Sequence, residues 1–206
     1  MNIDRRTTLH RCPRSLRRLV WAPQYFFIVL VAATASPATA VEMHPGNIYQ
    51  LTFTDVDRQQ LSTSDGHVTV ITVVTRTDEQ KAQTVGESFR RAYLGDPKYR
   101  LVSLVNFQQK IFPLLRGMVA AIIQSRANAE ARELQKVYAA KHLTRDARHD
   151  IFVIADFDGN AVAQLGIAPT SSEFAVFVFD GHGRLTRRWN DVPSADALTA
   201  AVNEAR

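Results

Sequence analysis

Cysteine is almost absent from this chain of 206 residues, whose single cysteine is Cys12. Thiol redox catalysis needs a thiolate and a disulfide bond needs two cysteines, so residues 13–206 can supply neither. The sequence also lacks the G-x-S-x-G motif, the phosphate-binding loop and the glycine pattern of dinucleotide-binding proteins. Hydrolase, NTPase and Rossmann-type functions therefore have no support in the sequence.

The first 40 residues have the pattern of a secretory signal peptide. Arginines precede the apolar run YFFIVLVAA (25–33), and ATA (38–40) fits the small-x-small cleavage rule. An uncleaved membrane anchor is the alternative, but the strongly apolar part is about half the length needed to span a bilayer. We therefore expect cleavage after Ala40, a periplasmic or secreted location, and one domain over residues 41–206.

Positive charge is concentrated in this expected signal peptide. The whole chain has 25 Lys and Arg, 20 Asp and Glu, and a net charge of +5. Six of the basic residues and one acidic residue lie within residues 1–40, which leaves 19 of each sign in residues 41–206. A nucleic-acid partner or an anionic membrane surface is therefore not expected for the exported domain.

Hydrophobic periodicity and turn residues predict an α/β fold. The β-branched run VTVITVV predicts a strand buried on both faces, and Ser194 is expected to cap the last helix. The expected elements are a hairpin (48–66), a strand (67–75), a helix (78–94), a strand (99–107), a helix (108–141), a strand, turn and short helix (150–167), a hairpin (174–189) and a helix (194–206).

The longest expected helix, 108–141, has two apolar stripes that we predict to face the core. Pro113 is expected near its start, and Gly117 or the polar stretch 125–133 is where it could bend or divide. The first stripe is Ile111, Leu115, Met118, Val119 and Ile122, and the second is Leu134, Val137 and Tyr138.

Two segments of the last third carry a family resemblance, DIFVIADFDGNAVAQLGI (150–167) and FAVFVFDGHGRL (174–185). They resemble the redoxin pattern of a strand ending at Asp-x-x-Gly, a short helix, and an F-x-x-D-x-x-G-R hairpin. With the order of the elements, this resembles the thioredoxin-like superfamily, in particular its AhpC-TSA and TlpA-like redoxins. The resemblance implies a thioredoxin-like fold, with a central mixed β-sheet flanked by helices and an N-terminal β-hairpin. The matching residues are Asp156, Gly159, Gly166, Ile167, Phe177, Asp180, Gly183 and Arg184.

The resemblance also implies where a redoxin would carry its active site. In that family the junction after the first core strand holds Cys-x-x-Cys or one peroxide-reactive cysteine, and a cis-proline precedes the penultimate strand. Aligned by the strands, the thiol positions fall near Asp78 and Lys81, and the proline position falls on Phe174 or on Pro169-Thr170. Both halves of the redox site are therefore altered. SSEFAVFVFDGHGR (171–184) is also similar to the cysteine-lacking periplasmic YtfJ-type proteins.

The candidate binding residues are those at the positions of the redoxin site. Thr77 and Gln80 also have the spacing of a capping box, which is the purely structural interpretation of the junction. The candidates are Arg76, Thr77, Asp78, Glu79, Lys81, Pro169, Thr170 and Phe174.

Metal ions and cofactors are not expected. Histidines 44, 67, 142, 149 and 182 lack the spacing of metal ligands. DFDGN (156–160) is similar to the start of a calcium loop, but its glycine comes two positions early, and Ile167 stands where the bidentate glutamate should be.

The leading hypothesis is an exported thioredoxin-like protein without thiol redox activity that binds another periplasmic protein, a peptide or a small molecule. A second hypothesis is an enzyme that reuses the cleft without a thiol, with Asp78 or Glu79 as the acid or base and Arg76 or Lys81 as the electrostatic group. A third is a structural subunit of a complex in the cell envelope.

Overall fold

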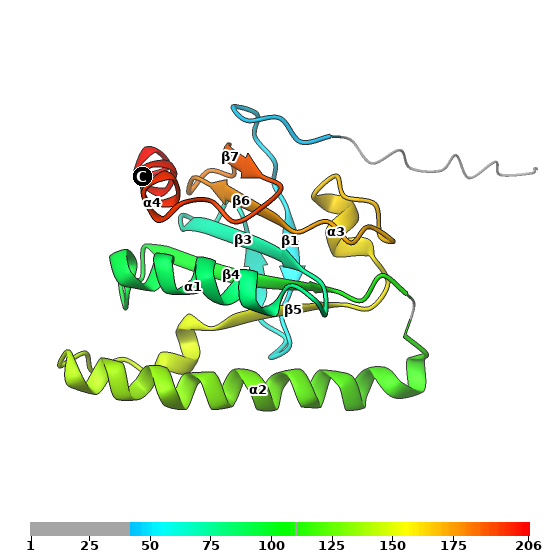
Figure 1. Ribbon diagram of the computed structural model, residues 1–206, viewed down its shortest axis with the longest axis horizontal. Coiled ribbons are helices and arrows are strands. Elements are labelled where there is room, and N and C mark those ends of the chain that lie inside the picture. The colour runs from blue at the N-terminus through cyan, green and yellow to red at the C-terminus, as the bar shows by residue number, and fades with distance from the viewer. Residues whose placement is uncertain (1–41, 110) are drawn as a thin grey trace, which may run out of the picture. The chain divides into compact units, whose positions relative to one another are not determined.

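The computed structural model describes residues 42–109 and 111–206 (Figure 1). The predicted signal peptide, residues 1–40, lies outside these described residues. Within them, no helix has both the length and the apolar character needed to cross a membrane.

A mixed five-stranded sheet in the order β5-β4-β3-β6-β7 forms the centre of the domain. Parallel pairing joins β3 (Val68–Val74), β4 (Tyr99–Asn106) and β5 (Phe152–Asp156), whereas β6 (Ala175–Phe179) and β7 (Leu185–Trp189) are antiparallel to their neighbours. Every residue of β3 and β6 is buried. Their β-branched and aromatic side chains suit central strands that are covered on both faces.

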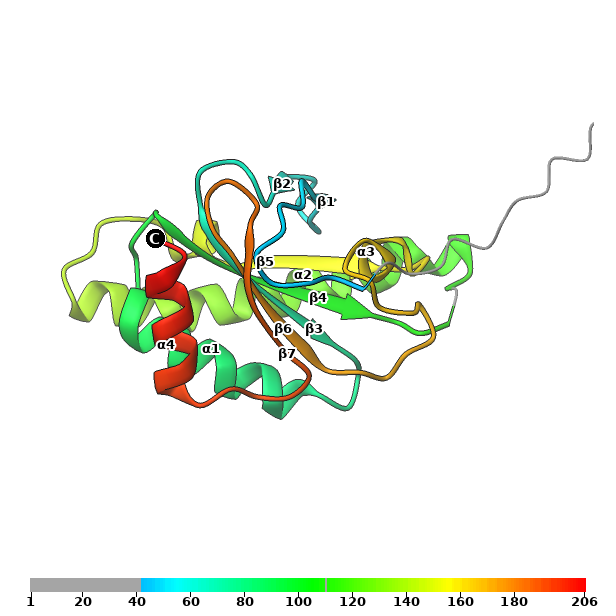
Figure 2. The same cartoon turned by 90° about the horizontal axis from the view of Figure 1, so that it is seen from above.

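Helices α1 (Glu79–Tyr93) and α4 (Ala195–Glu204) cover one face of the sheet (Figure 2). The other face is covered by α3 (Asn160–Gln164) and by the hairpin of β1 (Thr52–Thr54) and β2 (Gln60–Ser62). Two apolar clusters, one on each face, therefore enclose the central strands.

Local sequence signals set the ends of several elements. Gly95, at φ +72°, follows α1 in a left-handed conformation that favours glycine. The Ser194 side chain accepts a hydrogen bond from the backbone N–H of Ala197 (3.2 Å), so the predicted cap of α4 is confirmed. Pro113 is the first residue of α2, where its missing N–H has no cost.

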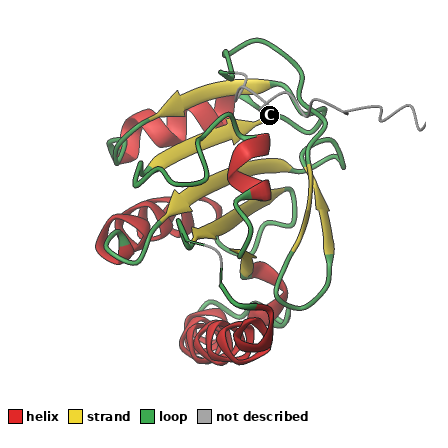
Figure 3. Ribbon diagram, turned by 90° about the vertical axis from the view of Figure 1, so that its right-hand side faces the viewer, coloured by secondary structure: helices red, strands yellow, loops and turns green. Residues whose placement is uncertain are grey.

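Helix α2 (Pro113–Ala140) runs without interruption past β5 (Figure 1). Figure 3 views this long helix nearly along its axis, with the strands to one side of it. The short 3-10 helix η1 (Ala147–Asp150) follows it. The C-terminal half of α2 buries Leu134 and Tyr138 against η1 and β5. The expectation of a bend or break in this helix is therefore wrong.

The first apolar stripe of α2 does not face the core, contrary to the prediction. Leu115, Met118 and Ile122 are 47%, 58% and 51% exposed. This half of the helix is anchored through other sides, because Arg116 bonds Asp158 and Gln124 bonds Asp57. Periodicity finds an apolar side of a helix, but tertiary contacts decide which side is turned inward.

The order and directions of the strands give a thioredoxin-like fold. A parallel β3-α1-β4 unit and an antiparallel β6-β7 pair followed by α4 share one sheet, with a separate N-terminal hairpin. The predicted fold class is confirmed. The parallel strands β3, β4 and β5 all end at the same edge of the sheet, which is where the redoxin-site positions lie.

Candidate functional site

The junction between β3 and α1 is closed by its own residues. The Asp78 carboxylate accepts hydrogen bonds from the backbone N–H (3.0 Å) and the hydroxyl (2.6 Å) of Thr75, the residue that follows β3. Asp78 is only 8% exposed. Its side chain thus faces back toward the strand instead of outward to a cleft.

The predicted capping box is wrong. The N-cap residue of α1 is Asp78, and no side chain caps the helix there. The Thr77 hydroxyl instead lies 3.0 Å from the Thr75 hydroxyl. The Asp78 carboxylate and the Thr77 hydroxyl contact the buried polar groups of Thr75 instead of capping the helix. A buried donor without a partner costs free energy, whereas water can bond the exposed N–H groups at the start of a helix.

The remaining candidates at the junction, Arg76, Thr77 and Glu79, are exposed. Lys81 is also exposed, and its Nζ atom lies 2.9 Å from Asp191 Oδ1. This hydrogen bond raises the pKa of Lys81 and lowers the pKa of Asp191. The amine is therefore held as a charged ammonium and does not have the lowered pKa of a catalytic lysine.

The structure brings Lys81 and Phe174 together. The Lys81 Nζ atom lies 5.3 Å from the centre of the Phe174 ring, a cation–π distance, and Phe174 is 3% exposed. Phe174 directly precedes β6 and is one of the two predicted proline positions, the other being Pro169-Thr170. The start of α1 and the start of β6 are therefore adjacent here, and the Phe174 ring belongs to the apolar cluster of α1 and α4.

Pro169 and Thr170 contribute to a different place, a cavity of about 90 Å³ at the ends of β4 and β5. The predicted site is thus divided between the junction and this cavity, which we call the strand-end cavity. Its lining residues are Asn106, Gln108, Gln109, Asp156, Phe157, Asp158, Gly159, Pro169 and Thr170.

Amide and carboxylate side chains around the strand-end cavity are held by hydrogen bonds to neighbouring groups. The buried Asn106 side chain donates to the Ser171 carbonyl (3.2 Å) and accepts from the Gln108 N–H (2.9 Å). Asp158 forms a bidentate pair with Arg116 of α2 (2.9 and 2.5 Å). Since sites for whole small molecules have volumes of roughly 300–1,000 Å³, this cavity has room for only one small group of a larger partner.

Sequence reasoning missed these residues of β4 and α2. Asn106 ends a strand without any motif around it, and Arg116 belongs to a helix whose orientation the periodicity did not fix. The sequence indicates the cavity only indirectly, through the predicted fold, because the ends of parallel strands meet at one edge of the sheet.

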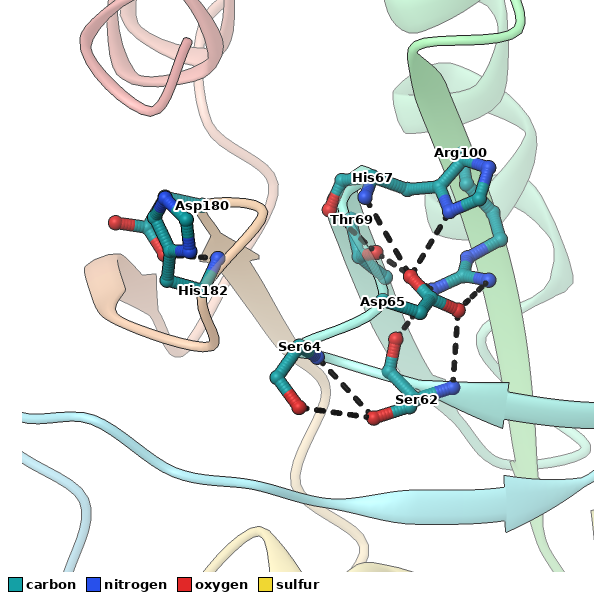
Figure 4. Close-up of polar contacts among 8 residues, drawn as sticks. All are labelled: Ser62, Ser64, Asp65, His67, Thr69, Arg100, Asp180 and His182. Atoms are coloured by element: carbon teal, nitrogen blue, oxygen red, sulfur yellow. Dashed lines mark hydrogen bonds and ion pairs between the residues drawn. The ribbon is translucent and has the colours of Figure 1, made fainter.

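The opposite edge of the sheet, where β3 and β4 begin, carries a denser polar cluster (Figure 4). The Asp65 carboxylate accepts hydrogen bonds from both terminal nitrogens of Arg100 (2.9 and 3.1 Å) and lies 2.8 Å from His67 Nδ1. Arg100 also donates to the Ser62 carbonyl and to the Thr69 hydroxyl. Burial acts to raise the pKa of Asp65, but the hydrogen bonds from Arg100 and His67 outweigh it and lower that pKa to about 2.

This cluster connects the β1–β2 hairpin to the sheet. Arg100 belongs to β4, Ser62 ends β2, and Asp65 lies in the segment between β2 and β3. The Arg100 side chain thus bonds groups at the end of β2, in the segment after it and in β3, so the arrangement serves the fold. No group of at least three His, Cys, Asp or Glu residues that could hold a metal ion exists within residues 42–109 and 111–206.

No protein-family model matches the chain, and no curated protein sequence matches it either. Solved structures do resemble it. A putative thiol:disulfide interchange protein DsbE from Chlorobium tepidum has a TM-score of 0.49 and 12% identity, covering 80% of this chain and 99% of that one. A peroxiredoxin-like protein from Aquifex aeolicus has a TM-score of 0.48 and 14% identity, covering 82% and 91%.

A secreted Mycobacterium tuberculosis disulfide oxidoreductase homologous to E. coli DsbE gives a TM-score of 0.44 with 14% identity, covering 75% of this chain and 96% of that one. At this level of similarity the fold assignment stands on the strand order and strand directions described above. The chain has a thioredoxin-like α/β fold, in which Asp78 and Lys81 lie at the positions predicted for the thiols of a redoxin.

Proposed function

We propose that this chain is an exported thioredoxin-fold protein of the cell envelope that binds a protein or peptide partner and has no thiol redox activity. The observation that carries the proposal is the state of the redoxin-site positions. Asp78 is bonded to Thr75, Lys81 is paired with Asp191, and the Phe174 ring is buried beside Lys81. With Cys12 as its only cysteine, the chain has no thiol within residues 13–206 to replace that chemistry.

The binding surface of this proposal is the edge at which the parallel strands end. It combines the strand-end cavity with two apolar side chains at the start of α2, Phe112 and Leu114, which are 76% and 96% exposed. Large exposed apolar and aromatic side chains beside polar groups are typical of surfaces that bind proteins. The small volume of the cavity favours a side chain or chain terminus of such a partner over a free small molecule.

Export is supported by the pattern of residues 1–40, with its arginines, its apolar run and the ATA cleavage sequence. Amino-terminal sequencing of the protein recovered from the periplasm or the medium tests this part. A first residue of Val41 is expected, and an intact leader on membrane-bound protein would contradict it.

The absence of thiol chemistry is tested with disulfide-reductase and peroxidase assays. The purified protein is expected to show no catalysis above the uncatalysed rate. The matched control is the double variant Asp78→Cys/Lys81→Cys, which places a Cys-x-x-Cys spacing at the start of α1, where thiol pKa values fall. Catalytic turnover by the unmodified protein would overturn the proposal.

Site-specific photo-crosslinking in intact cells tests the binding surface. A photoreactive residue at Leu114 is expected to give discrete crosslinked species. The control is the same residue at Ile48, which is also exposed (56%) but pairs with Arg184 in the turn after β6, at the opposite edge of the sheet. Equal crosslinking from both positions, or none from Leu114, would remove the assignment of the surface.

A further inference from the structure

Helix α2 exposes a long apolar stripe and, at its other end, an apolar groove. The stripe consists of Leu115, Met118 and Ile122, each about half exposed. Soluble monomers rarely leave a contiguous apolar patch of this kind uncovered. Because α2 continues for five more turns beyond Ile122, the stripe and the groove belong to one rigid element.

The groove lies between α1 and the C-terminal half of α2 and has a volume of about 410 Å³. Leu94, Leu134 and Val137 supply its apolar surface, and Val137 is 43% exposed. Charged residues of both signs surround these side chains. Its rim therefore suits a partner helix that brings apolar side chains to the floor and charges of both signs to the edge.

Stripe and groove rim lie along one side of α2. With 3.6 residues per turn, positions 115, 122, 126, 133 and 137 fall within a narrow range of angles around the helix axis. The side is apolar up to Ile122, carries Arg126 and then Glu133, and ends with Val137. When a second copy of this helix lies antiparallel to the first, apolar residues face apolar residues and Arg126 faces Glu133.

We propose that the protein forms a two-fold symmetric dimer in which the α2 helices of two copies pack antiparallel, with the axis passing between residues 129 and 130. This register places Ile122 opposite the partner's Val137 and Arg126 opposite the partner's Glu133. Every contact occurs twice, as an isologous interface requires.

The charges favour this register over one that pairs stripe with stripe. Arg126 forms no ion pair with any residue in the described part of the chain, and Glu133 is paired only with Lys136, where both side chains are 72% exposed. Both are therefore free to form an intermolecular pair. A stripe-on-stripe register, centred near residue 118, would leave Val137 outside the contact and give Arg126 no acidic group on α2 opposite it.

The overlap sets the size of the contact. Residues 118–141 of each copy overlap, and only the side of α2 that faces the partner is in contact, which gives fewer than the roughly 20–30 residues per side of standard interfaces. Ala129 lies at the axis, where its small side chain lets the two helices approach closely. Phe112, Leu114 and Leu115 lie outside the overlap.

Sedimentation equilibrium of the purified protein tests the dimer. A mass of two copies is expected at micromolar concentrations, and the variant Ile122→Asp is expected to be monomeric with unchanged circular dichroism, since Ile122 is a surface residue of the monomer. A monomeric mass for the unsubstituted protein at every concentration would overturn the proposal.

Charge exchange tests the register. Arg126→Glu and Glu133→Arg are each expected to raise the dissociation constant of the dimer about tenfold, because each brings like charges together. The double variant Arg126→Glu/Glu133→Arg restores opposite charges and is expected to recover the original value to within about threefold. A double variant that dimerises no better than the singles would exclude this register.

Disulfide crosslinking locates the axis, since the only natural cysteine is Cys12. In a Cys12→Ser background, Ala129→Cys is expected to form a crosslinked dimer on mild oxidation. Ala121→Cys, which is exposed on another side of α2, is the control and is expected to stay monomeric on a denaturing gel. The reverse result, or crosslinking at Met118→Cys alone, would contradict the antiparallel register proposed here.

Discussion

The two edges of the parallel part of the sheet each carry a carboxylate, but the two groups have different surroundings. At the edge where β3 ends, Asp78 is buried and accepts only from Thr75, three residues away. At the edge where β3 and β4 begin, Asp65 is 31% exposed in its side chain and pairs with Arg100 of the neighbouring strand. The first bond closes a turn, whereas the second joins segments 35 residues apart in the sequence.

The comparison shows that the position of a family's active site and the place of strong electrostatic interactions can be different. The junction of Asp78 is where a redoxin would place its chemistry, yet its groups are used to close the local backbone. The Asp65–Arg100 pair lowers the pKa of Asp65, yet it serves the attachment of the hairpin. A perturbed pKa is thus a sign of a functional site only when the group also faces a cavity.

The largest expected effect is from Arg100→Ala. The substitution removes the bonds to Asp65, Ser62 and Thr69 at a residue that is 6% exposed. We expect the free energy of unfolding to fall by about 3 kcal/mol, toward the lower end for buried pairs because Asp65 is partly solvated. Urea denaturation measures it. The control is Arg187→Ala, which removes the exposed ion pair of Arg187 with Glu204. It should change the free energy of unfolding by less than about 0.5 kcal/mol.

A smaller effect is expected from Asp78→Ala. The variant leaves the buried backbone N–H of Thr75 without its acceptor, which should cost about 2 kcal/mol in the free energy of unfolding. The neighbouring variant Glu79→Ala, at an exposed position, should stay within about 0.5 kcal/mol of the original protein. A neutral Asp78→Ala would mean that the carboxylate is not a structural group, and the enzyme hypothesis would regain support.

The pH dependence of stability tests the Asp65 carboxylate separately. Because the pKa of Asp65 in the folded protein is about 2, below its usual 3.8, its stabilisation is fully present above pH 3.8 and is lost as the pH falls toward 2. With partial solvent screening, we expect about 1–2 kcal/mol from this group. Urea titrations between pH 2 and 6 should show this loss in the original protein but not in Asp65→Asn. Parallel curves for both proteins would contradict the assignment.

The smallest effect is expected from Lys81→Met. Lys81 and Asp191 are both exposed, so their ion pair is screened by salt and water. The variant should unfold at the same urea concentration as the original within experimental error, at low and at high salt alike. A clear loss of stability only at low salt would show that the pair holds the junction together.

Sequence patterns located most of the fold and only part of the candidate site. Runs such as VTVITVV and the turn at Asp180–Gly183 have local causes, so β3 and the β6–β7 hairpin agree with the prediction. The proximity of Lys81 and Phe174 also follows from the aligned strands. The strand-end cavity was not predictable, because Asn106 and Arg116 lie on different elements and meet Pro169 only in the tertiary structure.

The sequence by itself determined the chemistry that residues 13–206 lack and the order of their strands and helices, because thiol content, β-branched runs and capping residues act locally. Only the tertiary structure decided the direction in which Asp78 points and the side of α2 that faces the domain. Both depend on which partners lie nearby in space. A buried donor beside Asp78 and an anchoring pair at Arg116 set those directions, and neither is encoded in the periodicity of one segment.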